Sequence, residues 1–397
     1  MEEFNDEVEK QFEKIKRNCS EIVPEIELKK KLQKSIKTKK PLRIKLGADP
    51  SSPNLHIGHS VVLQKLKDFQ ELGHQVIFLI GDFTAQIGDP TGKKETRKSL
   101  SSDETQQNAK TYSDQVFKVL DPTKTQIVFN SQWCNQLKIA DILRLSAQMT
   151  VARMLERDDF QKRFESQQPI SLHEFMYPIM QAYDSVQLRA DVELGGSDQR
   201  FNILLGREYQ KSHGQETQVG IFLPLLEGTD GTQKMSKSLG NDIGITEAPK
   251  EIFGKIMSIS DELMIRYYEI LSNEEIKAVQ AEHPRDAKIN LAKIIVERFH
   301  NSEEADKVAQ GFLDQFSKGK LPDDIPIFNS ELSSIALTKL MVERELASSL
   351  SEARRLISQN AVSIDGQKIS DTKAVLEATN NGVLKVGKRK YLKIQLS

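Results

Sequence analysis

The feature that most constrains the fold is a strand, a turn, a helix and a second strand near the start of the chain. "LRIKLG" (42–47) has the apolar bias of a strand, and "DPSSPN" (49–54) has the composition of a turn. The next helix keeps one face apolar through Val62, Leu66, Phe69 and Leu72. Gly73 ends it before another apolar strand, "QVIFLIGD" (75–82). This pattern predicts an α/β fold with a doubly wound, Rossmann-like parallel sheet, whose ligands bind at the carboxyl ends of the strands.

Composition limits the partners and the compartment. With 56 Lys+Arg against 57 Asp+Glu in 397 residues, the chain has no bulk positive charge, so any contact with nucleic acid must be local. Cys19 and Cys134 are the only cysteines, which argues against a disulfide framework or a cysteine-built metal site. The start, "MEEFNDEVEKQFEKIKRN", is charged throughout, and no long apolar run occurs. We therefore expect a soluble cytoplasmic protein with no membrane segment and no metal site.

The sequence "LHIGHS" (55–60) places two histidines where the turn gives way to the helix. Gly58 lets a ligand approach the backbone closely, and the helix amino terminus offers unpaired N–H groups and a positive dipole to an anion. His56 and His59 can then donate hydrogen bonds to phosphate oxygens. The alternative is structural, with His56 capping the helix and His59 packing on its first turn. The short pattern alone does not separate the two interpretations.

A second short motif lies much later, in "DGTQKMSKSLG" (230–240). Lys234 and Lys237, flanked by serines and glycines, predict a mobile cationic loop. In isolation, an ordinary solvated loop would be the simpler interpretation. In this order and on this fold, the two motifs resemble the HIGH and KMSKS sequences of class I aminoacyl-tRNA synthetases.

Longer segments between the motifs narrow the resemblance. "IGDPTGKKETR" (87–97), "YPIMQAYD" (177–184) and "ELGGSDQRFNILLGRE" (193–208) resemble bacterial tyrosyl-tRNA synthetases, and the likeness runs from about Leu42 to the carboxyl end. Three polar residues fall at i, i+4 and i+7, so a helix brings them to one face: Tyr177, Gln181 and Asp184. Three converging polar groups suit an amino acid zwitterion with a polar tip.

The resemblance implies roles for these polar residues. Tyr177, Gln181 and Asp89 are expected around the α-ammonium of L-tyrosine, while Asp184 accepts a hydrogen bond from the phenol and Gln199 lies on the tyrosine side. Asp198 is expected on the ATP ribose. The whole expected ATP site comprises Gly47, Asp49, His56, Gly58, His59, Gly196, Asp198, Lys234 and Lys237. Local sequence alone would make Asp89 the turn former of "GDPTG" and Asp198, or Ser197 before it, a helix cap.

One position departs from the family pattern. Many bacterial relatives have a tyrosine two residues before the glycine of the "GADP" turn, near the substrate hydroxyl, where this chain has Lys45. Lys45 either holds the phenol with a different donor or points elsewhere. The position matters because an indole N–H could also donate to Asp184, so that carboxylate alone does not separate tyrosine from tryptophan. "GGSDQ" (195–199) and the carboxyl-terminal segment favour the tyrosyl family over the tryptophanyl one.

The implied reaction is adenylate formation, in which the tyrosine carboxylate attacks the α-phosphorus of ATP and pyrophosphate leaves. No enzyme nucleophile is needed, because such transfers depend on positioning and charge stabilisation by the basic residues of the two motifs. Lys93 and Arg97 are expected to form a second cationic loop over the pyrophosphate, unless that run is only a solvated loop. Ser51 is expected to contribute a hydroxyl. We expect no protein-bound cofactor, with ATP entering as a substrate with Mg²⁺.

Past Gly240 the sequence changes character. Residues 241–320 are almost strand-free, which predicts a small helical domain after a catalytic domain of residues 1–240, and the resemblance implies that it contacts the anticodon stem. A linker (317–331) precedes residues 332–397, which resemble an S4 RNA-binding domain. Its expected RNA-binding residues are Arg354, Arg355, Lys388, Arg389 and Lys390. A solvated helix face is the alternative for the two arginines alone.

The resemblance therefore implies the activity of a tyrosine–tRNA ligase, with L-tyrosine, ATP and tRNA(Tyr) as partners and a homodimer as the assembly. Two alternatives stay open. One is an enzyme like tryptophanyl-tRNA synthetase, and the other is a non-catalytic S4-type RNA-binding protein. The intact histidines and lysines of both ATP motifs argue against the second.

Overall fold

The computed structural model describes residues 4–50, 53–90, 102–317, 325–330, 334–377, 382–387 and 390–396. Contacts divide the chain into two compact units, Met1–Ala309 and Gln310–Ser397. The boundary between them falls within helix α16 (Ser302–Ser317). The finer division into a catalytic, a helical and an S4-like domain stays a prediction.

A six-stranded sheet forms the centre of the first unit. Its strand order is β1-β6-β5-β2-β3-β4, and all neighbours are parallel except β1, which is antiparallel to β6. β2 and β3 lie within two residues of the predicted strands 42–47 and 75–82. The strands are β1 (Glu21–Val23), β2 (Arg43–Ala48), β3 (Gln75–Ile80), β4 (Thr125–Phe129), β5 (Val192–Gly196) and β6 (Val219–Leu223). The doubly wound, Rossmann-like fold is confirmed.

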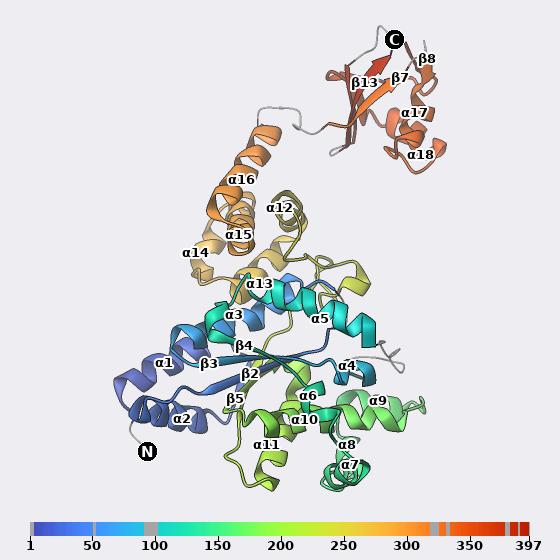
Figure 1. The fold of residues 1–397 in the computed structure, drawn as a ribbon. Coiled ribbons are helices and arrows are strands. Elements are labelled where there is room, and N and C mark those ends of the chain that lie inside the picture. Colours follow the sequence, from blue (N-terminus) through green and yellow to red (C-terminus); the bar gives the residue numbers. More distant parts are fainter. Residues whose placement is uncertain are drawn as a thin grey trace. The chain divides into compact units, whose positions relative to one another are not determined.

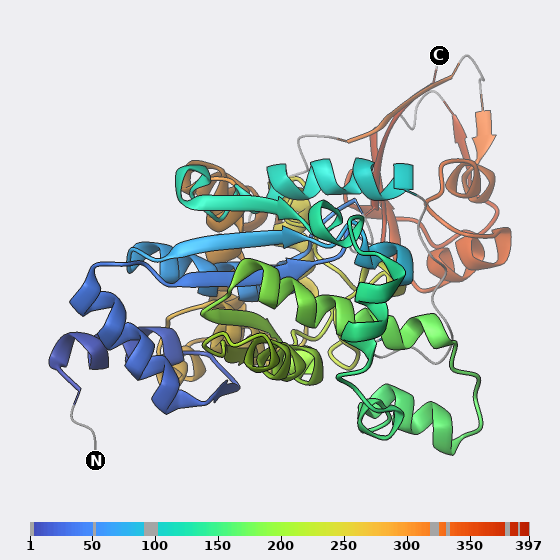
Figure 2. The same ribbon diagram turned by 60° about the horizontal axis from the view of Figure 1, so that its bottom comes forward.

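Helices cover both faces of this sheet (Figure 1, Figure 2). α3 (Ile57–Glu71) packs on β2, β3 and β5, whereas α10 (Met176–Leu188) and α11 (Arg200–Ser212) cover the other face. Gly73 follows α3 with a φ of +84°, a left-handed conformation that glycine adopts without steric cost. The sequence pattern that predicted helix and stop therefore corresponds to a buried apolar helix face and a glycine turn.

The described part of the first unit has further helices before Ser212. They are α1 (Asp6–Lys16), α2 (Glu25–Thr38), α4 (Thr84–Ile87), α5 (Ser102–Val116), α6 (Ser131–Cys134), α7 (Ile139–Ser146), α8 (Val151–Met154) and α9 (Asp158–Glu165). Single 3-10 turns occur at Pro122–Lys124, Leu172–Phe175, Ser197–Gln199 and Lys237–Leu239. Apolar residues of α9, α10 and α11, such as Phe160, Met180 and Leu205, share one core cluster. That cluster supports the helix that carries the predicted tyrosine-binding residues.

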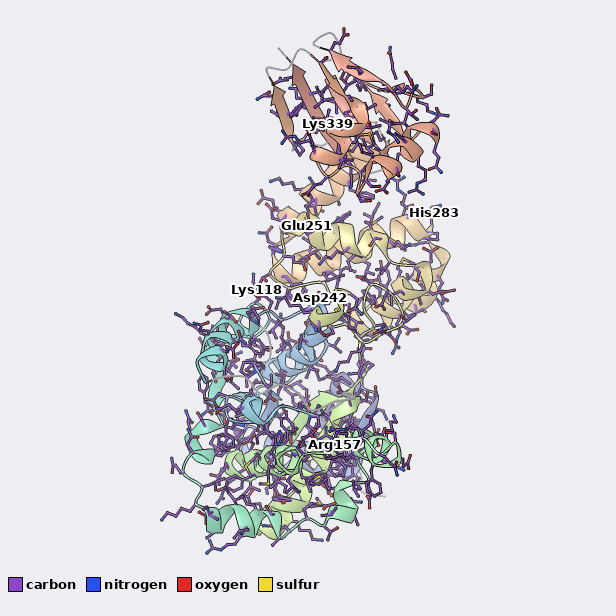
Figure 3. The ribbon with its side chains drawn as sticks, turned by 90° about the vertical axis from the view of Figure 1, so that its right-hand side faces the viewer. Lys118, Arg157, Asp242, Glu251, His283 and Lys339 are labelled. Atoms are coloured by element: carbon purple, nitrogen blue, oxygen red, sulfur yellow. The ribbon has the colours of Figure 1, made fainter. Side chains whose placement is uncertain are left out.

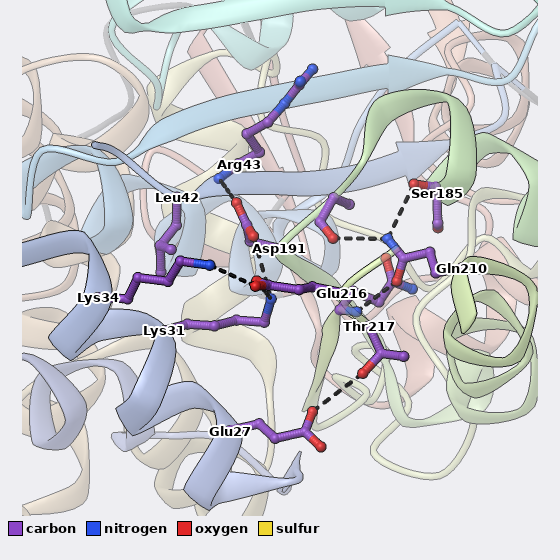
Figure 4. A network of polar contacts seen from close by, with 12 residues as sticks. Glu27, Lys31, Lys34, Leu42, Arg43, Ser185, Asp191, Gln210, Glu216 and Thr217 are labelled. Carbon is purple, nitrogen blue, oxygen red and sulfur yellow. Dashed lines mark hydrogen bonds and ion pairs between the residues drawn. The ribbon is translucent and has the colours of Figure 1, made fainter. Parts of the chain in front are cut away.

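A polar network ties α2 to the amino ends of β2 and β5 (Figure 4). The carboxylate of Asp191, just before β5, lies 3.3 Å from the Lys31 ammonium and accepts a 2.9 Å hydrogen bond from the backbone N–H of Arg43. Lys34 of the same helix pairs with Glu216 at 2.6 Å. These contacts fix the edge of the sheet opposite to the carboxyl ends of its parallel strands.

The segment after Gly240 is helical, as its sequence predicted. Its described part consists of helices and connecting loops, with one isolated bridge at Gly244. Figure 3 labels Glu251 on α12 and His283 before α15 in this helical part, and Arg157 in the part that holds the sheet. The helices are α12 (Pro249–Ser258), α13 (Asp261–Leu271), α14 (Ile276–Ala281), α15 (Pro284–Phe299) and α16.

The second unit begins with the end of α16, and its described part then combines the helices α17 and α18 with small sheets. A five-stranded sheet has the order β10-β9-β12-β13-β7, and β11 pairs with β8. The strands are β7 (Ile327–Ser330), β8 (Ser334–Ala336), β9 (Val362–Ile364), β10 (Gln367–Lys368), β11 (Val375–Glu377), β12 (Gly382–Val386) and β13 (Lys390–Leu396). α17 (Leu337–Glu343) and α18 (Leu350–Ser358) contribute to a single apolar cluster that also includes Leu384 and Leu392. This unit is α+β and has its own core.

In the described part of the chain, the helices are all too short or too polar to cross a lipid bilayer.

Candidate active site

The strand order creates a switch point between β2 and β5. The chain leaves β2 toward β3 and β4, whereas β5 leads to β6 on the other side, and such a divergence opens a crevice at the carboxyl ends of the strands. A cavity of about 290 Å³ lies there, lined by the ends of both strands at Gly47 and Gly196. An open groove of about 1370 Å³ shares part of its lining with the cavity.

Most of the predicted site residues that the structure describes meet in these two hollows. The cavity lining includes Gly47, Asp49, His59, Asp89, Tyr177, Gln181, Asp184, Gly196, Asp198, Gln199 and Lys234. The groove lining adds His56 and Lys237. Residues from distant parts of the sequence are thus brought to one edge of the sheet.

The two histidines stand at the first turn of α3. His56 is the N-cap residue, and its backbone N–H donates to Nδ1 of His59 at 3.2 Å. The ring centroids are 3.9 Å apart. Because Nδ1 of His59 accepts this hydrogen bond, the ring proton belongs on Nε2, which can donate to a ligand. The structural and the ligand-binding interpretations of "LHIGHS" are therefore compatible.

Both imidazoles are neutral near pH 7. Burial, together with the charge of Lys234, lowers the pKa of His56 to about 4. Burial also lowers the pKa of His59 well below its usual value, and His56 and Lys234 act in the same direction. Neutral imidazoles donate hydrogen bonds without adding charge. Positive charge near these rings therefore comes from lysines.

Backbone pairing holds the second motif beside the first. His56 and Gly244 form an antiparallel bridge, and the N–H of Ile57 donates to the carbonyl of Ile243 at 2.9 Å. Met235, in the middle of the lysine motif, is buried. The "KMSKS" segment is therefore anchored through a buried side chain and through the strand-like segment that follows it.

One lysine of this loop reaches the predicted ribose-binding carboxylate. Nζ of Lys234 lies 2.6 Å from Oδ2 of Asp198, although 56% of the lysine side chain is exposed. Lys237 is also exposed and lines the groove. Asp230 shapes the loop by accepting hydrogen bonds from two backbone N–H groups and from Asn241, and these bonds lower the pKa of Asp230 to about 2.

A buried arginine supports Asp89. Nη2 of Arg157 lies 3.0 Å from one oxygen of Asp89, and Nε2 of Gln199 donates to the other at 2.9 Å (Arg157 is labelled in Figure 3). Asn202 in turn donates to Oε1 of Gln199 at 2.9 Å and to Oε1 of Gln181 at 3.0 Å. Three of the predicted tyrosine-binding residues thus belong to one hydrogen-bonded network.

Tyr177 connects this network with Asp49. Its hydroxyl donates to Oδ2 of Asp49 at 2.9 Å, and the Thr84 hydroxyl donates to Oδ1 at 2.7 Å. Burial, reinforced by the neighbouring carboxylates Asp49 and Asp89, raises the pKa of Tyr177 well above its usual value. The hydroxyl therefore stays protonated, and its lone pairs can accept hydrogen bonds from a ligand.

Asp184 is a buried acceptor in the cavity wall. Nε1 of Trp133 donates to one of its oxygens at 2.8 Å, and Nδ2 of Asn130 donates to the other at 3.2 Å. Burial raises the pKa of Asp184 to about 7, against the effects of Lys45 and of these two hydrogen bonds. An ionised carboxylate with two donors can accept further hydrogen bonds, as a phenol would require.

Lys45 is turned toward α10 and β5 and is not part of the cavity lining. Its ammonium is completely buried, and it lies 2.9 Å from Oε1 of Glu193. It also donates to the Ser185 hydroxyl at 2.7 Å and to the carbonyl of Gln181 at 3.2 Å. Glu193 itself lines the cavity. The sequence left two orientations open for Lys45, toward the phenol or elsewhere. In the structure, its side chain does not line the cavity, so it points elsewhere.

Several members of these networks were not predicted, among them Asn130, Trp133, Arg157 and Glu193. Asn130 directly follows β4, and polar residues after parallel strands face ligand sites, so strand position could have identified it. The segments of Trp133 and Arg157 carry no motif. Their roles depend on contacts between distant parts of the chain, which the sequence does not show.

The predicted RNA-binding residues of the second unit have different surroundings. Arg354 and Arg355 are exposed on α18, and Arg355 lies 3.5 Å from Glu352. Lys390 donates to the backbone carbonyl of Glu345 at 2.7 Å and to that of the next residue at 3.2 Å. Five predicted residues fall outside the described parts of the chain: Ser51, Lys93, Arg97, Lys388 and Arg389.

The described residues include no group of three or more His, Cys, Asp or Glu side chains that could hold a metal ion.

Two family models together match nearly the whole of the chain from residue 37 onward. One, described as tRNA synthetases class I (W and Y), matches residues 37–317. The other, described as the tyrosine–tRNA ligase SYY-like C-terminal domain, matches residues 316–394. The tyrosine–tRNA ligase of Carboxydothermus hydrogenoformans is 55% identical over 98% of both chains. The chain belongs to the tyrosine–tRNA ligase family.

Further relatives of this family support the assignment. The tyrosine–tRNA ligase of Moorella thermoacetica is 53% identical over 98% of this chain and 96% of its own. A tyrosyl-tRNA synthetase of Archaeoglobus fulgidus, solved in complex with L-tyrosine, is 25% identical, has a TM-score of 0.60 and covers 76% of this chain and 99% of its own. The second family model is specific to tyrosine–tRNA ligases, so the tryptophanyl alternative is not favoured.

Proposed function

We propose that this protein activates L-tyrosine with ATP to tyrosyl-adenylate and pyrophosphate, and then transfers tyrosine to the terminal ribose of tRNA(Tyr). The observation that carries the proposal is the cavity at the switch point, which has acceptors for an ammonium at one side and a buried acceptor for a phenol at another. It opens toward the groove that contains both motifs. Membership of the tyrosine–tRNA ligase family supports the same reaction.

L-Tyrosine would bind with its ammonium against three acceptors. Asp89 offers a carboxylate, Gln181 an amide oxygen and Tyr177 a hydroxyl whose own proton is donated to Asp49. An ammonium has three N–H donors, so this set can satisfy all of them. The phenol would donate to Asp184. Phenylalanine would leave that acceptor without the additional donor, which disfavours its binding. Tyrosyl-tRNA synthetases are themselves a well-known example of this kind of rejection.

Adenylate formation requires one bond to form and one to break. A tyrosine carboxylate oxygen attacks the α-phosphorus of ATP, and the bond to the bridging oxygen breaks as pyrophosphate takes the electron pair. We assign His56 and His59 as neutral donors to phosphate oxygens, and Lys234 and Lys237 as the cations that stabilise charge on the leaving group. For Lys234 this assignment requires its ammonium to move from Asp198, which would then accept from the ribose.

The proposal also includes residues outside the described parts of the chain. Lys93 and Arg97 would add positive charge over the pyrophosphate, and Ser51 would add a hydroxyl. ATP would enter with Mg²⁺ bound to its phosphates, which is the usual form of nucleotide substrates. No protein-bound cofactor is required for this chemistry.

Tyrosine-dependent exchange of pyrophosphate into ATP tests the first step directly. We expect exchange with L-tyrosine and scarcely any with L-tryptophan or L-phenylalanine. Equal exchange with tryptophan would end the tyrosyl assignment. Absence of exchange, together with retained RNA binding, would favour the non-catalytic alternative.

The second unit would bind tRNA through Arg354 and Arg355, while the helices after residue 240 would contact the anticodon stem. In the full chain, Arg354→Glu with Arg355→Glu should leave pyrophosphate exchange unchanged and weaken tRNA binding. The salt dependence of binding should also flatten, because each phosphate contact releases counterions. Lys339→Glu is the matched control, since Lys339 is an exposed cation on α17 (labelled in Figure 3) and is not assigned to the RNA surface. Equal losses in both variants would remove the arginines from the proposal.

We further infer a homodimer in the cytoplasm. Large apolar side chains on and near α7, α8 and α9 are exposed, which suits contact with a second copy of the chain. They are Ile139, Leu143, Val151, Phe164 and Leu172, with exposures from 63% to 82%. Sedimentation at micromolar concentration should give a dimer, and Ile139→Asp with Leu143→Asp should give a monomer. A monomeric parent protein would contradict the inference.

A further inference from the structure

The buried pair Lys45–Glu193 lies at the cavity wall, where Glu193 is part of the lining and Lys45 is not, and it has no role in the adenylation chemistry itself. Both side chains are almost completely inaccessible, with exposures of 0% and 2%. Charged side chains are rarely buried without a specific partner, because their transfer from water is unfavourable. The position therefore needs an explanation beyond packing.

Lys45 forms hydrogen bonds with α10 on both sides of Asp184. Its ammonium donates to the carbonyl of Gln181, three residues earlier, and to the hydroxyl of Ser185, one residue later. Glu193 accepts from the same Ser185 hydroxyl at 2.8 Å and from Nε2 of Gln181 at 3.4 Å. The part of α10 that carries Asp184, the expected phenol acceptor, is thus fixed by hydrogen bonds to one buried ion pair.

Further contacts fix the pair itself. Nε2 of Gln218 donates to the second oxygen of Glu193. The backbone carbonyl of Ser185 accepts from Nε2 of Gln210 at 3.2 Å, so α11 also holds this part of α10 (Figure 4 shows the Gln210 contact). The strands β2 and β5, which carry the two residues, and Gln218, just before β6, therefore all constrain the position of the pair relative to α10.

We propose that Lys45 and Glu193 are positioning residues that set the position and the charge of Asp184 for binding of the substrate phenol. The inference rests on the proposed function, because it concerns the tyrosine end of that site. Neither residue touches the reacting atoms. They would act through Asp184, which must be an ionised acceptor when the phenol donates to it.

The charges around Asp184 support opposite effects of the two residues. Burial raises the pKa of Asp184 to about 7, the ammonium of Lys45 lowers it and the carboxylate of Glu193 raises it. On the α6 side, Cys134 is buried, and its pKa is raised so that the thiol stays protonated. The other titratable or charged groups nearby are Asp82 beside that thiol and, in the cavity lining, Asp49, His59, Asp89, Tyr112, Tyr177, Asp198 and Lys234.

The test is the dissociation constant for L-tyrosine between about pH 5.5 and 8.5. Binding can be followed by the fluorescence of Trp133, the single tryptophan of the chain, whose indole donates to Asp184. In the parent protein, binding should weaken as pH falls below a midpoint near the pKa of Asp184, by up to about tenfold per pH unit. The sign follows from the ionised carboxylate being the binding form.

The variants should move this midpoint in opposite directions. Lys45→Met should shift it upward by about one pH unit or more, since an attractive charge near Asp184 is lost. Glu193→Gln should shift it downward, because a repelling charge is lost. The double variant should return toward the parent midpoint. Lys45→Met should also narrow the preference for tyrosine over phenylalanine at pH 7, because phenylalanine lacks the donor.

Lys31→Met is the matched control. Lys31 is also a buried lysine paired with a carboxylate, that of Asp191, but it lies at the amino end of the strands (Figure 4). Its variant should keep the parent midpoint. Shifts of the same sign in Lys45→Met and Glu193→Gln, or no shift in either, would overturn the proposal. If Lys45→Met does not fold, an unchanged or raised midpoint in Glu193→Gln overturns it by itself.

Failure of this inference differs from failure of the proposed function. If the parent protein shows no tyrosine-dependent pyrophosphate exchange, the proposed function is wrong. If exchange is present and the midpoints do not separate, only the role of Lys45 and Glu193 is wrong.

Discussion

The two ends of the site are built in opposite ways. At the tyrosine end, Asp184, Glu193 and Lys45 are buried and held by several partners each. At the phosphate end, Lys234 and Lys237 are exposed, and the loop that carries them lines an open groove. One end is held in place by buried contacts before a ligand arrives, whereas the other presents cations that are exposed.

The difference follows from what each end must distinguish. A phenol differs from a phenyl ring by one hydroxyl, and rejecting the wrong ring requires a desolvated acceptor that is costly to leave unpaired. A leaving pyrophosphate gains charge during the reaction, so its ligands should act more strongly on the transition state than on bound ATP. Buried charge at one end and exposed charge at the other suit these two tasks.

Arg157→Met should have the largest effect, and it should appear as lost stability. The variant leaves the carboxylates of Asp89 and Asp159 without the arginine that lies 3.0 and 2.8 Å from them. Breaking a buried ion pair by removing one partner costs about 3 to 5 kcal/mol. Urea denaturation followed by Trp133 fluorescence measures the change in the first unit.

Arg153→Met provides the comparison for that variant. Arg153 lies four residues earlier, but its side chain is 49% exposed, and its partners are the surface residues Glu156 and Glu208. Exposed pairs contribute little, so a change below about 1 kcal/mol is expected. Equal losses of unfolding free energy in the two variants would mean that the buried contacts of Arg157 stabilise the protein no more than the surface contacts of Arg153.

Lys234→Ala should lower turnover by about 100- to 1000-fold, as expected when one preorganised donor to developing charge is removed. Tyrosine affinity should stay within about twofold, because the Lys234 ammonium is assigned to the phosphates and not to tyrosine. The measurement is pyrophosphate exchange at saturating substrates beside equilibrium binding of tyrosine. Lys124→Ala is the control, since Lys124 is an exposed lysine before the amino end of β4. A larger loss in tyrosine affinity than in turnover would contradict the assignment of Lys234 to the phosphate end of the site.

The same contrast explains what the sequence could and could not predict. The phosphate end could be predicted from the sequence, because its residues lie in two short contiguous motifs, one with His56 and His59 and the other with Lys234 and Lys237. The family resemblance implied the roles of Tyr177, Gln181 and Asp184, and their spacing predicted that one helix face would bring them together. The partners that hold the tyrosine end, such as Arg157, come from other segments, and a single sequence contains no record of which distant side chains meet.

The direction of Lys45 shows the same limit. As a lysine on a strand, it could have faced either side of the sheet or reached toward the phenol. Its direction is decided by Glu193 on the neighbouring strand and by Ser185 on α10, and both contacts require the folded sheet. The fold itself was predictable, because apolar periodicity around one glycine turn is a local property.

Gly58→Ala should give a smaller, purely local effect at the phosphate end. A Cβ at position 58 would lie 2.9 Å from Nδ1 and 3.0 Å from Cε1 of His56, so the imidazole must shift. A misplaced donor should lower turnover by about tenfold, equivalent to about 1.4 kcal/mol. Gly254→Ala is the control, because a Cβ there meets nothing within 4 Å. It should leave turnover unchanged and raise stability slightly, as expected for alanine in a helix. Equal turnover in the parent and Gly58→Ala proteins would remove His56 from the phosphate contacts.

Tyr177→Phe should have the smallest effect, and it tests where the two ends meet. The Tyr177 hydroxyl donates to Asp49, which is assigned to ATP, while its lone pairs face the expected tyrosine ammonium. Loss of one such hydrogen bond costs about 1 kcal/mol, so tyrosine affinity should fall by roughly fivefold.

The comparison variant for Tyr177→Phe is Tyr209→Phe, which removes a buried hydroxyl that donates to the carbonyl of Leu145 at 2.8 Å, away from the cavity lining. It should lower stability by a similar amount and leave tyrosine affinity unchanged. If Tyr177→Phe weakens ATP binding as much as tyrosine binding, the hydroxyl acts mainly by orienting Asp49. Tyr177 would then contribute to both ends of the site. Asp49, which is assigned to ATP, would have to be counted with the buried tyrosine end.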